Sequence, residues 1–258
     1  MKEFQMAVIL SADKISEGIY EMVLSAELKE KARPGQFLML YPKGESTLLP
    51  RPISICEISD NKYRLVYRVS GKGTKEFSEY KEGDRVRILG PLGNGFDATK
   101  GKGKKVFVIG GGIGIPPMLE LSKRLDLEEC ESLTAFMGYR NSDLFLKNDF
   151  EKVISLKIAT EDGSKGSKGN VLDAIKESGL KADIIYACGP MPMLRALKEY
   201  AILKNIEAYI SLEERMACGV GACLGCVAKT THKDSHSQVN NKRVCTEGPV
   251  FEAREVEI

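Results

Sequence analysis

The sequence predicts an α+β chain of several domains: an antiparallel Greek-key β-barrel, an α/β domain on a parallel sheet, and a small cysteine-rich subdomain. Residues 1 to about 97 form short segments that alternate apolar and polar side chains. Beyond the lysine- and glycine-rich stretch at 100–105, apolar strands are followed by helical periods. After Ile206 the chain is too short for a core of its own. We expect the domain boundaries at 1–98, 99–208 and 209–258.

Length and composition set the outer limits of this interpretation. The 258 residues suffice for two compact domains and a small appendage, and 43% hydrophobic with 29% charged residues is ordinary for a globular protein. The net charge of +2 and the lysines at turns, without interleaved aromatics, give little support to nucleic-acid binding. The apolar run at 106–119 is too short and too rich in glycine and proline to span a membrane. We therefore expect any membrane contact to come through a partner.

The N-terminal segments have the period of strands. Alternating runs bounded by Gly, Pro, Asp and Asn are typical of an antiparallel barrel. The runs that show this pattern are 5–12, 18–26, 35–42, 63–70 and 84–90.

The middle of the chain switches to strands that alternate with helices, which implies right-handed crossovers and a parallel sheet. The expected strands end at 112, 140, 162 and 190, and the expected helices are 116–125, 171–179 and 191–205.

Two predicted strand ends carry glycine. A strand that ends in clustered glycines before a helix presents amides and a positive dipole end to a pyrophosphate. The first such end has Gly110, Gly111, Gly112 and Gly114, but Ile115 stands where G-x-G-x-x-G needs its third glycine. A tight turn without a ligand explains this motif equally well.

The second strand end favours a nucleotide. It contains Cys188, Gly189 and Pro190, and it belongs to the carboxyl edge of the sheet, where ligands bind in open α/β folds. Cys188 alone is more often a small buried residue than a participant in chemistry.

Four cysteines near the C-terminus have the spacing C-x4-C-x2-C…C of a plant-type 2Fe-2S cluster. Thiolates supply soft, charged ligands, and the intervening glycines let the backbone fold tightly around inorganic sulfide. The predicted ligands are Cys218, Cys223, Cys226 and Cys245, with Gly219, Gly221 and Gly225 between them.

Three other kinds of site compete for these cysteines. Zinc knuckles pair two short C-x2-4-C units, whereas here the fourth cysteine follows an 18-residue gap. Disulfides fit poorly with seven cysteines and a start without an apolar signal segment, which indicates a reducing, cytoplasmic setting. A Rieske centre needs two histidine ligands, and we expect His232 and His236 to lie in a solvated loop.

A third motif, RPISI at 51–55 followed by VYRVSGKGT at 66–74, resembles the flavin-binding pattern of the ferredoxin-reductase superfamily. The resemblance implies that the arginine reaches the flavin phosphate, that Ser54 lies near the reactive edge, and that Cys188 lies near the flavin and nicotinamide. Taken alone, Arg51 could be a surface cation and Tyr67 a strand aromatic. The implied flavin contacts are Arg51, Pro52, Ile53, Ser54, Val66, Tyr67, Arg68, Gly73 and Thr74.

The order of the three motifs covers nearly the whole chain and resembles the electron transfer subunits of NAD-dependent dihydroorotate dehydrogenase. The local matches are GPLGNGF at 90–96, ACGPMPML at 187–194, MACGVGACLGC at 216–226 and VCTEGPVF at 244–251. Related subunits of flavin-based NAD(P)H:ferredoxin oxidoreductases have aspartate as the first cluster ligand, so Cys218 favours the dihydroorotate branch. The gap before Cys245 is interpreted as a longer surface hairpin.

Electron counting gives the expected mechanism. Nicotinamide exchanges two electrons as a hydride and the cluster exchanges one, so a flavin must stand between them. The resemblance implies FAD, a 2Fe-2S cluster and NAD as co-substrate, and a role in pyrimidine (UMP) biosynthesis. It also implies a separate FMN-containing catalytic subunit in an α2β2 heterotetramer. No residue of this chain needs to touch dihydroorotate.

Two alternatives stay open from the residues. One is a stand-alone or bifurcating-type NAD(P)H:ferredoxin oxidoreductase subunit, and the other is a zinc-stabilised flavin module without an electron-relay role. The choice of NAD over NADP rests on the resemblance, because Arg140 could face either a pyrophosphate or a 2'-phosphate and no acidic residue is assigned to the ribose.

Overall fold

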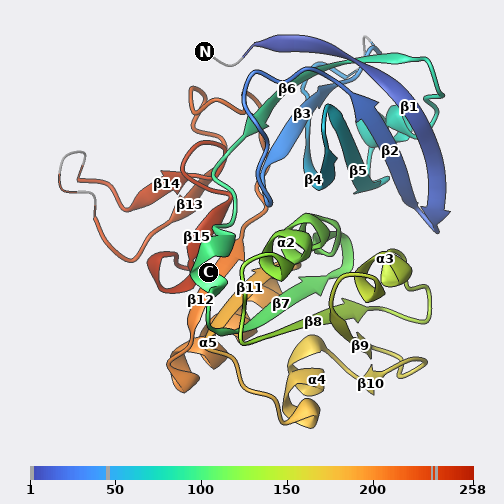
Figure 1. The fold of residues 1–258 in the computed structure, drawn as a ribbon. Coiled ribbons are helices and arrows are strands. Elements are labelled where there is room, and N and C mark those ends of the chain that lie inside the picture. The colour runs from blue at the N-terminus through green and yellow to red at the C-terminus, as the bar shows by residue number, and fades with distance from the viewer. Residues whose placement is uncertain (1–2, 45–46, 234, 236–237) are drawn as a thin grey trace.

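The computed structural model describes residues 3–44, 47–233, 235 and 238–258. The N-terminal barrel lies over one face of a parallel sheet, and the cysteine-bearing segment runs beside both (Figure 1).

The N-terminal part is a closed antiparallel barrel with the strand order β1-β2-β5-β4-β3-β6, as the alternating pattern predicts. Its inward side chains form an apolar core, and the helix α1 (Lys72–Phe77) adds the fully buried Phe77 to it. The strands are β1 (Phe4–Ser16), β2 (Ile19–Ser25), β3 (Phe37–Tyr41), β4 (Arg51–Ser59), β5 (Lys62–Arg68) and β6 (Arg85–Leu92).

The following part is a seven-stranded sheet with the order β10-β9-β8-β7-β11-β12-β15. The first six strands are parallel, which confirms the predicted α/β architecture, and only β15 pairs antiparallel. The strands are β7 (Lys105–Gly111), β8 (Ser132–Tyr139), β9 (Ser155–Thr160), β10 (Ser167–Lys168), β11 (Ile184–Cys188), β12 (Glu207–Ser211) and β15 (Val250–Glu252).

Helices cover both faces of this sheet. The helices α2 (Pro116–Asp126) and α3 (Lys147–Glu151) lie on the face toward the barrel, and α4 (Val171–Ser178) and α5 (Met191–Lys204) lie on the other (Figure 1). Successive residues of a strand point to opposite faces, so Val106 and Val108 of β7 join the α2 side while Phe107 and Ile109 join the α4 side. The sheet strands are accordingly apolar on both faces.

The barrel and the sheet domain share a core. Ile19, Cys56 and Val66 on the outside of the barrel are at most 4% exposed and pack into the apolar cluster formed by α2 and the sheet. This continuous packing fixes the barrel on the α2 face.

The C-terminal segment contains a short hairpin of β13 (Val227–Lys229) and β14 (Asn241–Arg243). This confirms the hairpin expected between the last two cysteines. His232 lies exposed in it, whereas His236 is outside the described residues. The described residues also include three short 3-10 helices, at Ala98–Gly101, Gly112–Gly114 and Ala253–Glu255.

Candidate functional site

Two adjoining cavities, each about 400 Å³, lie where the barrel, the sheet and the C-terminal segment meet. We name each cavity after the ligand that the sequence predicts for it. The nucleotide cavity is lined mainly by strand ends of the sheet, and the flavin cavity is lined mainly by β4, β5 and the segment after β12. Arg68, Ile113 and Glu213 line both cavities, so a ligand in one would face a ligand in the other.

The flavin cavity contains eight of the nine residues predicted to contact flavin. They come together because β4 and β5 are neighbours in the barrel and both line the cavity that adjoins the sheet domain. The eight are Arg51, Pro52, Ile53, Ser54, Val66, Tyr67, Arg68 and Thr74.

The ninth residue, Gly73, lies behind the cavity wall against Arg51. A Cβ atom at this position would be 2.9 Å from the Arg51 Nε, so glycine leaves room for the guanidinium group. Arg51 Nη1 donates to the Leu49 carbonyl at 2.7 Å. Thr74 Oγ1 accepts from the Ser70 amide at 2.9 Å and so shapes the turn that enters α1.

Tyr67 borders the flavin cavity, but its ring belongs to the barrel core. The ring stacks on Tyr20 with centroids 6.2 Å apart and meets Phe77 edge-on. Burial raises the pKa of the Tyr67 hydroxyl above its usual value, and this buried oxygen has no hydrogen-bond partner among the described residues.

The glycine turn after β7 lines the nucleotide cavity together with the end of β11. Of the predicted residues, Gly111, Gly112, Gly114, Gly189 and Pro190 lie in its wall. A Cβ atom on Gly114 would be 2.5 Å from the carbonyl carbon of Cys188, so the two strand ends meet this closely only because residue 114 is glycine.

Two further predicted cofactor residues lie outside the wall of the nucleotide cavity. A Cβ atom on Gly110 would be 2.6 Å from the Met137 Sδ, so Gly110 faces the interior of the sheet domain. Cys188 lines the flavin cavity, where it is 3% exposed and where burial raises the pKa of its thiol to about 12.

Glu161 is a residue of the nucleotide cavity that sequence reasoning missed. It follows β9 and lines the cavity together with Arg140, which follows β8. In the dinucleotide fingerprint the acidic residue comes about 20 residues after the glycines, whereas Glu161 comes about 50 residues after them. Only the sheet order, which places β9 beside β8, could have identified it.

Glu213 is a second missed residue and lies where the cavities meet. Although its side chain reaches solvent, the surrounding walls remove part of its hydration and raise the pKa of the carboxyl group, against the attraction of Arg68. A carboxyl group with a raised pKa binds its proton more readily than usual. Of the carboxyl groups in the described residues, it is the one that lines both cavities.

The four predicted cluster cysteines form two adjacent pairs of free thiols. Cys218 lies beside Cys223, and Cys226 lies beside Cys245. Within the described ranges, no three His, Cys, Asp or Glu side chains converge closely enough to hold one metal ion. Two pairs of thiols are compatible with the two irons of a 2Fe-2S cluster, each held by two protein ligands.

The loop around Cys218 favours a thiolate. Burial alone would raise the pKa of this thiol, but the backbone amides of Val220 and Cys223, at 3.5 and 3.4 Å from its sulfur, outweigh burial and lower the pKa to about 6. The opposite holds for Cys245, where burial and the neighbouring Cys226 raise the pKa to about 12. A bound metal would have to displace that proton.

The cysteine loop is fastened to the barrel beside the flavin cavity. Gly219 has φ +71°, and a Cβ atom there would be 2.8 Å from Met39 of β3. Met216 lines the flavin cavity only two residues before Cys218, so their Cα atoms are at most about 7 Å apart. A cluster in the loop and a flavin in the cavity would thus be neighbours.

A buried hydroxyl next to Cys245 lacks a partner. Thr246 Oγ1 is shielded from solvent, and no acceptor or donor for it is found in the described part of the chain. It borders Gly221, whose amide points at the Cys245 sulfur. A sulfide or thiolate of a bound cluster would be a suitable acceptor for this hydroxyl.

Comparison with known families agrees with this geometry. Residues 213–257 match the iron-sulfur cluster binding domain of dihydroorotate dehydrogenase B, and residues 108–199 match the oxidoreductase NAD-binding domain.

Relatives of known function match over nearly the full length. The electron transfer subunit of dihydroorotate dehydrogenase B (NAD(+)) from Caldanaerobacter subterraneus subsp. tengcongensis is 43% identical over 250 residues, which cover 97% of each chain. The subunit of the same name from Geobacillus sp. (strain WCH70) is 42% identical over 263 residues and 99% of each chain.

Solved structures show the same architecture. An NADH-dependent reduced ferredoxin-NADP oxidoreductase aligns with a TM-score of 0.86 at 27% identity, covering 98% of this chain and 90% of its own. The ferredoxin reductase of carbazole 1,9a-dioxygenase has a TM-score of 0.67 at 19% identity, over 80% and 67% of the two chains, and shows the ferredoxin-reductase fold alone.

Proposed function

Because this chain belongs to the family of dihydroorotate dehydrogenase B (NAD(+)) electron transfer subunits, we propose that it passes electrons from a dihydroorotate-oxidising partner to NAD+. The cofactors are FAD, a 2Fe-2S cluster and NAD as co-substrate. FAD, when bound, connects the two-electron chemistry of nicotinamide with the one-electron chemistry of the cluster.

The observation that carries this proposal is the central place of the flavin cavity. On one side it shares Arg68, Ile113 and Glu213 with the nucleotide cavity, and on the other side its wall continues through Met216 to Cys218. This order of sites is the order in which electrons must travel.

The main residues of the two cavities and of the cysteine loop have proposed roles in this arrangement. Arg51 and Thr74 hold the flavin phosphates, and Ser54 and Cys188 border the ring. The glycine turn and Pro190 hold the nicotinamide nucleotide, Glu161 accepts from its ribose, and the four cysteines hold the cluster.

The segments 1–98, 99–208 and 209–258 bind flavin, nucleotide and cluster, respectively.

None of the helices among the described residues combines the length and apolar character that crossing a bilayer requires. We propose a cytoplasmic location because the cysteines are free thiols, which persist in a reducing compartment.

The partner is an FMN-containing dihydroorotate dehydrogenase catalytic subunit, in an α2β2 heterotetramer. Exposed apolar side chains rim the cysteine loop: Val220 is 46% exposed and Leu224 is 62% exposed, and Cys223 is also exposed. Apolar surface around an electron-transfer centre suits contact with a second protein.

The test is anaerobic reconstitution with the partner co-expressed from the same genome. NADH formation from dihydroorotate and NAD+ should require both chains, while the isolated chain should oxidise NADH with artificial acceptors. Dihydroorotate oxidation by the isolated chain would refute the proposal.

A stand-alone or bifurcating-type NAD(P)H:ferredoxin oxidoreductase subunit is the second candidate, favoured by the alignment over 98% of the chain with such an oxidoreductase. Full turnover with ferredoxin in the absence of any FMN protein would support it. The relay proposal predicts instead that an FMN protein co-purifies.

A further inference from the structure

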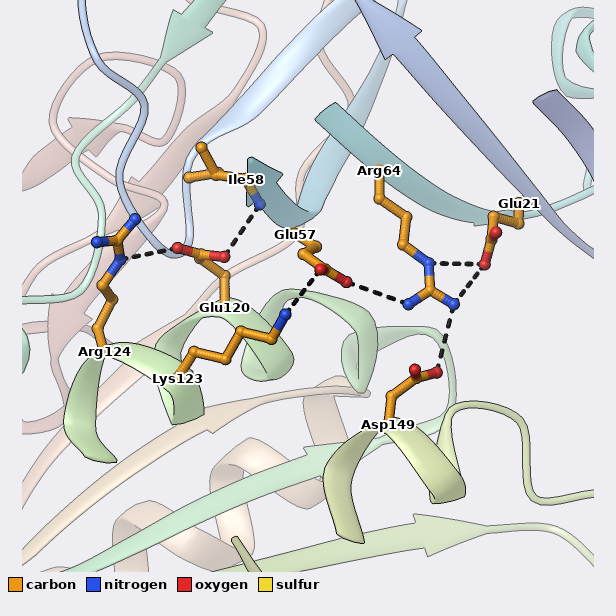
Figure 2. Close-up of polar contacts among 8 residues, drawn as sticks. All are labelled: Glu21, Glu57, Ile58, Arg64, Glu120, Lys123, Arg124 and Asp149. Atoms are coloured by element: carbon orange, nitrogen blue, oxygen red, sulfur yellow. Dashed lines mark hydrogen bonds and ion pairs between the residues drawn. The ribbon is translucent and has the colours of Figure 1, made fainter. Parts of the chain in front are cut away.

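Glu120 is a buried carboxylate that joins the sheet domain to the barrel. It lies on α2, and its side chain is only 2% exposed. One carboxylate oxygen accepts from the Ile58 amide of β4 at 3.0 Å, and the other accepts from Arg124 Nε at 2.8 Å (Figure 2). Burying a carboxylate is costly unless it is hydrogen-bonded, so this contact is directional and specific.

The Ile58 amide lies where β4 has lost its neighbour. The strand β3 pairs with Arg51–Ser54, and the Gln36 carbonyl extends this ladder to Ile55. In the described part of the barrel no strand continues along this edge of β4 to Ile58. The Glu120 carboxylate takes the place of the missing strand and caps the edge from the other domain.

The two elements in this contact are those that carry the cofactor motifs. The strand β4 begins with the RPIS residues of the flavin cavity, and α2 begins directly after the glycine turn of the nucleotide cavity. Lys123 of α2 also pairs with Glu57 of β4 at 2.7 Å.

A second bridge reinforces the first. Arg64 of β5 contacts Glu21 at 2.7 Å and Glu57 at 3.2 Å within the barrel, and it reaches Asp149 of α3 at 3.3 Å (Figure 2). Its side chain is only 20% exposed, so the network is largely shielded from water. The strand β5 carries three further residues of the predicted flavin set, at Val66–Arg68.

We propose that Glu120 is a positioning residue for hydride transfer, whose contact with Ile58 sets the distance between a flavin on the barrel and a nicotinamide on the glycine turn. This rests on the proposed function, in which FAD, when bound and reduced, would give two electrons and a proton to NAD+ as a hydride; reduction of the flavin by NADH would be the same step in reverse. Hydride transfer requires reacting atoms about 3–3.5 Å apart, and a displacement of about 1 Å can slow a reaction about 100-fold. A contact that connects the two supports is well placed to hold that distance.

The test compares Glu120→Ala and Glu120→Gln in the full chain loaded with FAD and cluster. Stopped-flow absorbance gives the rate of flavin reduction at saturating NADH, and redox titration gives the flavin midpoint potential. We expect Glu120→Ala to slow reduction at least about 10-fold with unchanged flavin potential and FAD content. Glu120→Gln keeps an acceptor oxygen for Ile58 and should fall between Glu120→Ala and wild type.

The matched control is Glu151→Gln. Glu151 pairs with Lys147 at 2.7 Å within α3, so this variant also neutralises an ion-paired glutamate of the sheet domain without touching the barrel. It should reduce at the wild-type rate. Lys123→Met removes the more accessible bridge and should slow reduction about 2- to 5-fold, since Glu120 still holds β4.

Wild-type rates in Glu120→Ala would overturn the inference, and so would a loss of rate that only follows loss of FAD or a shifted potential. If Glu120→Ala does not fold, Glu120→Gln and Lys123→Met decide, and wild-type rates in both are the overturning result. Failure of NADH to reduce the wild-type flavin would refute the proposed function instead, so the two failures are distinguishable.

Discussion

The cavity region and the cysteine loop are built in opposite ways. The cavities lie between two domains that share an apolar core and a buried polar network, whereas the cysteine loop presents Cys223 and the apolar residues Val220 and Leu224 at the surface. Hydride transfer requires reacting atoms about 3–3.5 Å apart, while electron transfer between cofactors tolerates larger gaps. The protein therefore packs tightly where distance matters and leaves surface where a partner must bind.

The strongest test of this division is Cys223→Ser. Loss of one thiolate should remove the cluster and abolish electron transfer from the partner, while NADH still reduces the flavin because neither cavity is touched. Iron and acid-labile sulfide content measures the cluster in the cysteine loop. Stopped-flow flavin reduction by NADH measures the function of the cavity region.

The control is Cys130→Ser, which changes a free thiol outside both regions. It should retain cluster and relay activity. If Cys223→Ser loses flavin reduction despite retained FAD, the two regions are not separable.

Gly114→Ala tests the packed side of the comparison. The new Cβ atom would lie 2.5 Å from the Cys188 backbone and force the two strand ends of the nucleotide cavity apart. Such overpacking costs about 1–3 kcal/mol, and we expect roughly a 10- to 100-fold loss of kcat/KM for NADH with the cluster spectrum unchanged.

Gly71→Ala is its control, because among the described residues no atom beyond the adjacent chain neighbours lies within 4 Å of the Cβ position at residue 71. Steady-state reduction of an artificial acceptor measures both variants. Equal activity of the two would show that the close approach at Gly114 is not needed.

Glu213→Gln sharpens the comparison where the cavities meet. Desolvation raises the pKa of this carboxyl group in the folded protein, so its ionised form is less favourable there than in the unfolded chain. The stability that the neutral carboxyl group gives is therefore fully present below its ordinary pKa and is lost as pH rises through the native pKa. We expect the variant to have a higher apparent Tm at about pH 8, by no more than about 2 °C given its exposure, and no difference near pH 4.

Thermal scans of FAD-loaded protein across this pH range measure the effect. The adjacent exposed Glu214→Gln serves as the control. A Tm difference that grows toward low pH would contradict a raised native pKa at Glu213.

The smallest expected effect is on the cluster side, with Thr246→Val. A hydroxyl that donates to a cluster sulfur stabilises the more negative reduced cluster, so its removal should lower the midpoint potential. One hydrogen bond of about 1 kcal/mol corresponds to roughly 40 mV for one electron.

EPR-monitored titration measures this shift, with the exposed Thr231→Val as control. An unchanged potential would mean that the Thr246 hydroxyl has another acceptor. The flavin potential should stay the same in either case, because the threonine lies outside both cavities.

Sequence predicted the parts of the site that are contiguous along the chain. The RPIS residues share strand β4 and three of the four predicted cysteines share one loop, so motifs along the chain were enough to group them. The same reasoning failed for Glu161, because its neighbour Arg140 is close only through the pairing of β9 with β8. It also missed Glu120, because a glutamate in a helix gives no sign that its carboxylate caps a distant strand. The strand β15 has three residues, too few to show a period.

That short strand has a consequence for exchanging parts between reductases. Because Phe251 of β15 pairs with Ile210 of β12, the end of the chain forms the edge strand of the sheet whose strand ends line the nucleotide cavity. A cluster module cut from this protein at the hairpin would leave the β12 edge bare and open to aggregation. A working chimera must therefore transplant the cysteine loop together with the strand that follows it, or supply a new edge strand from its host.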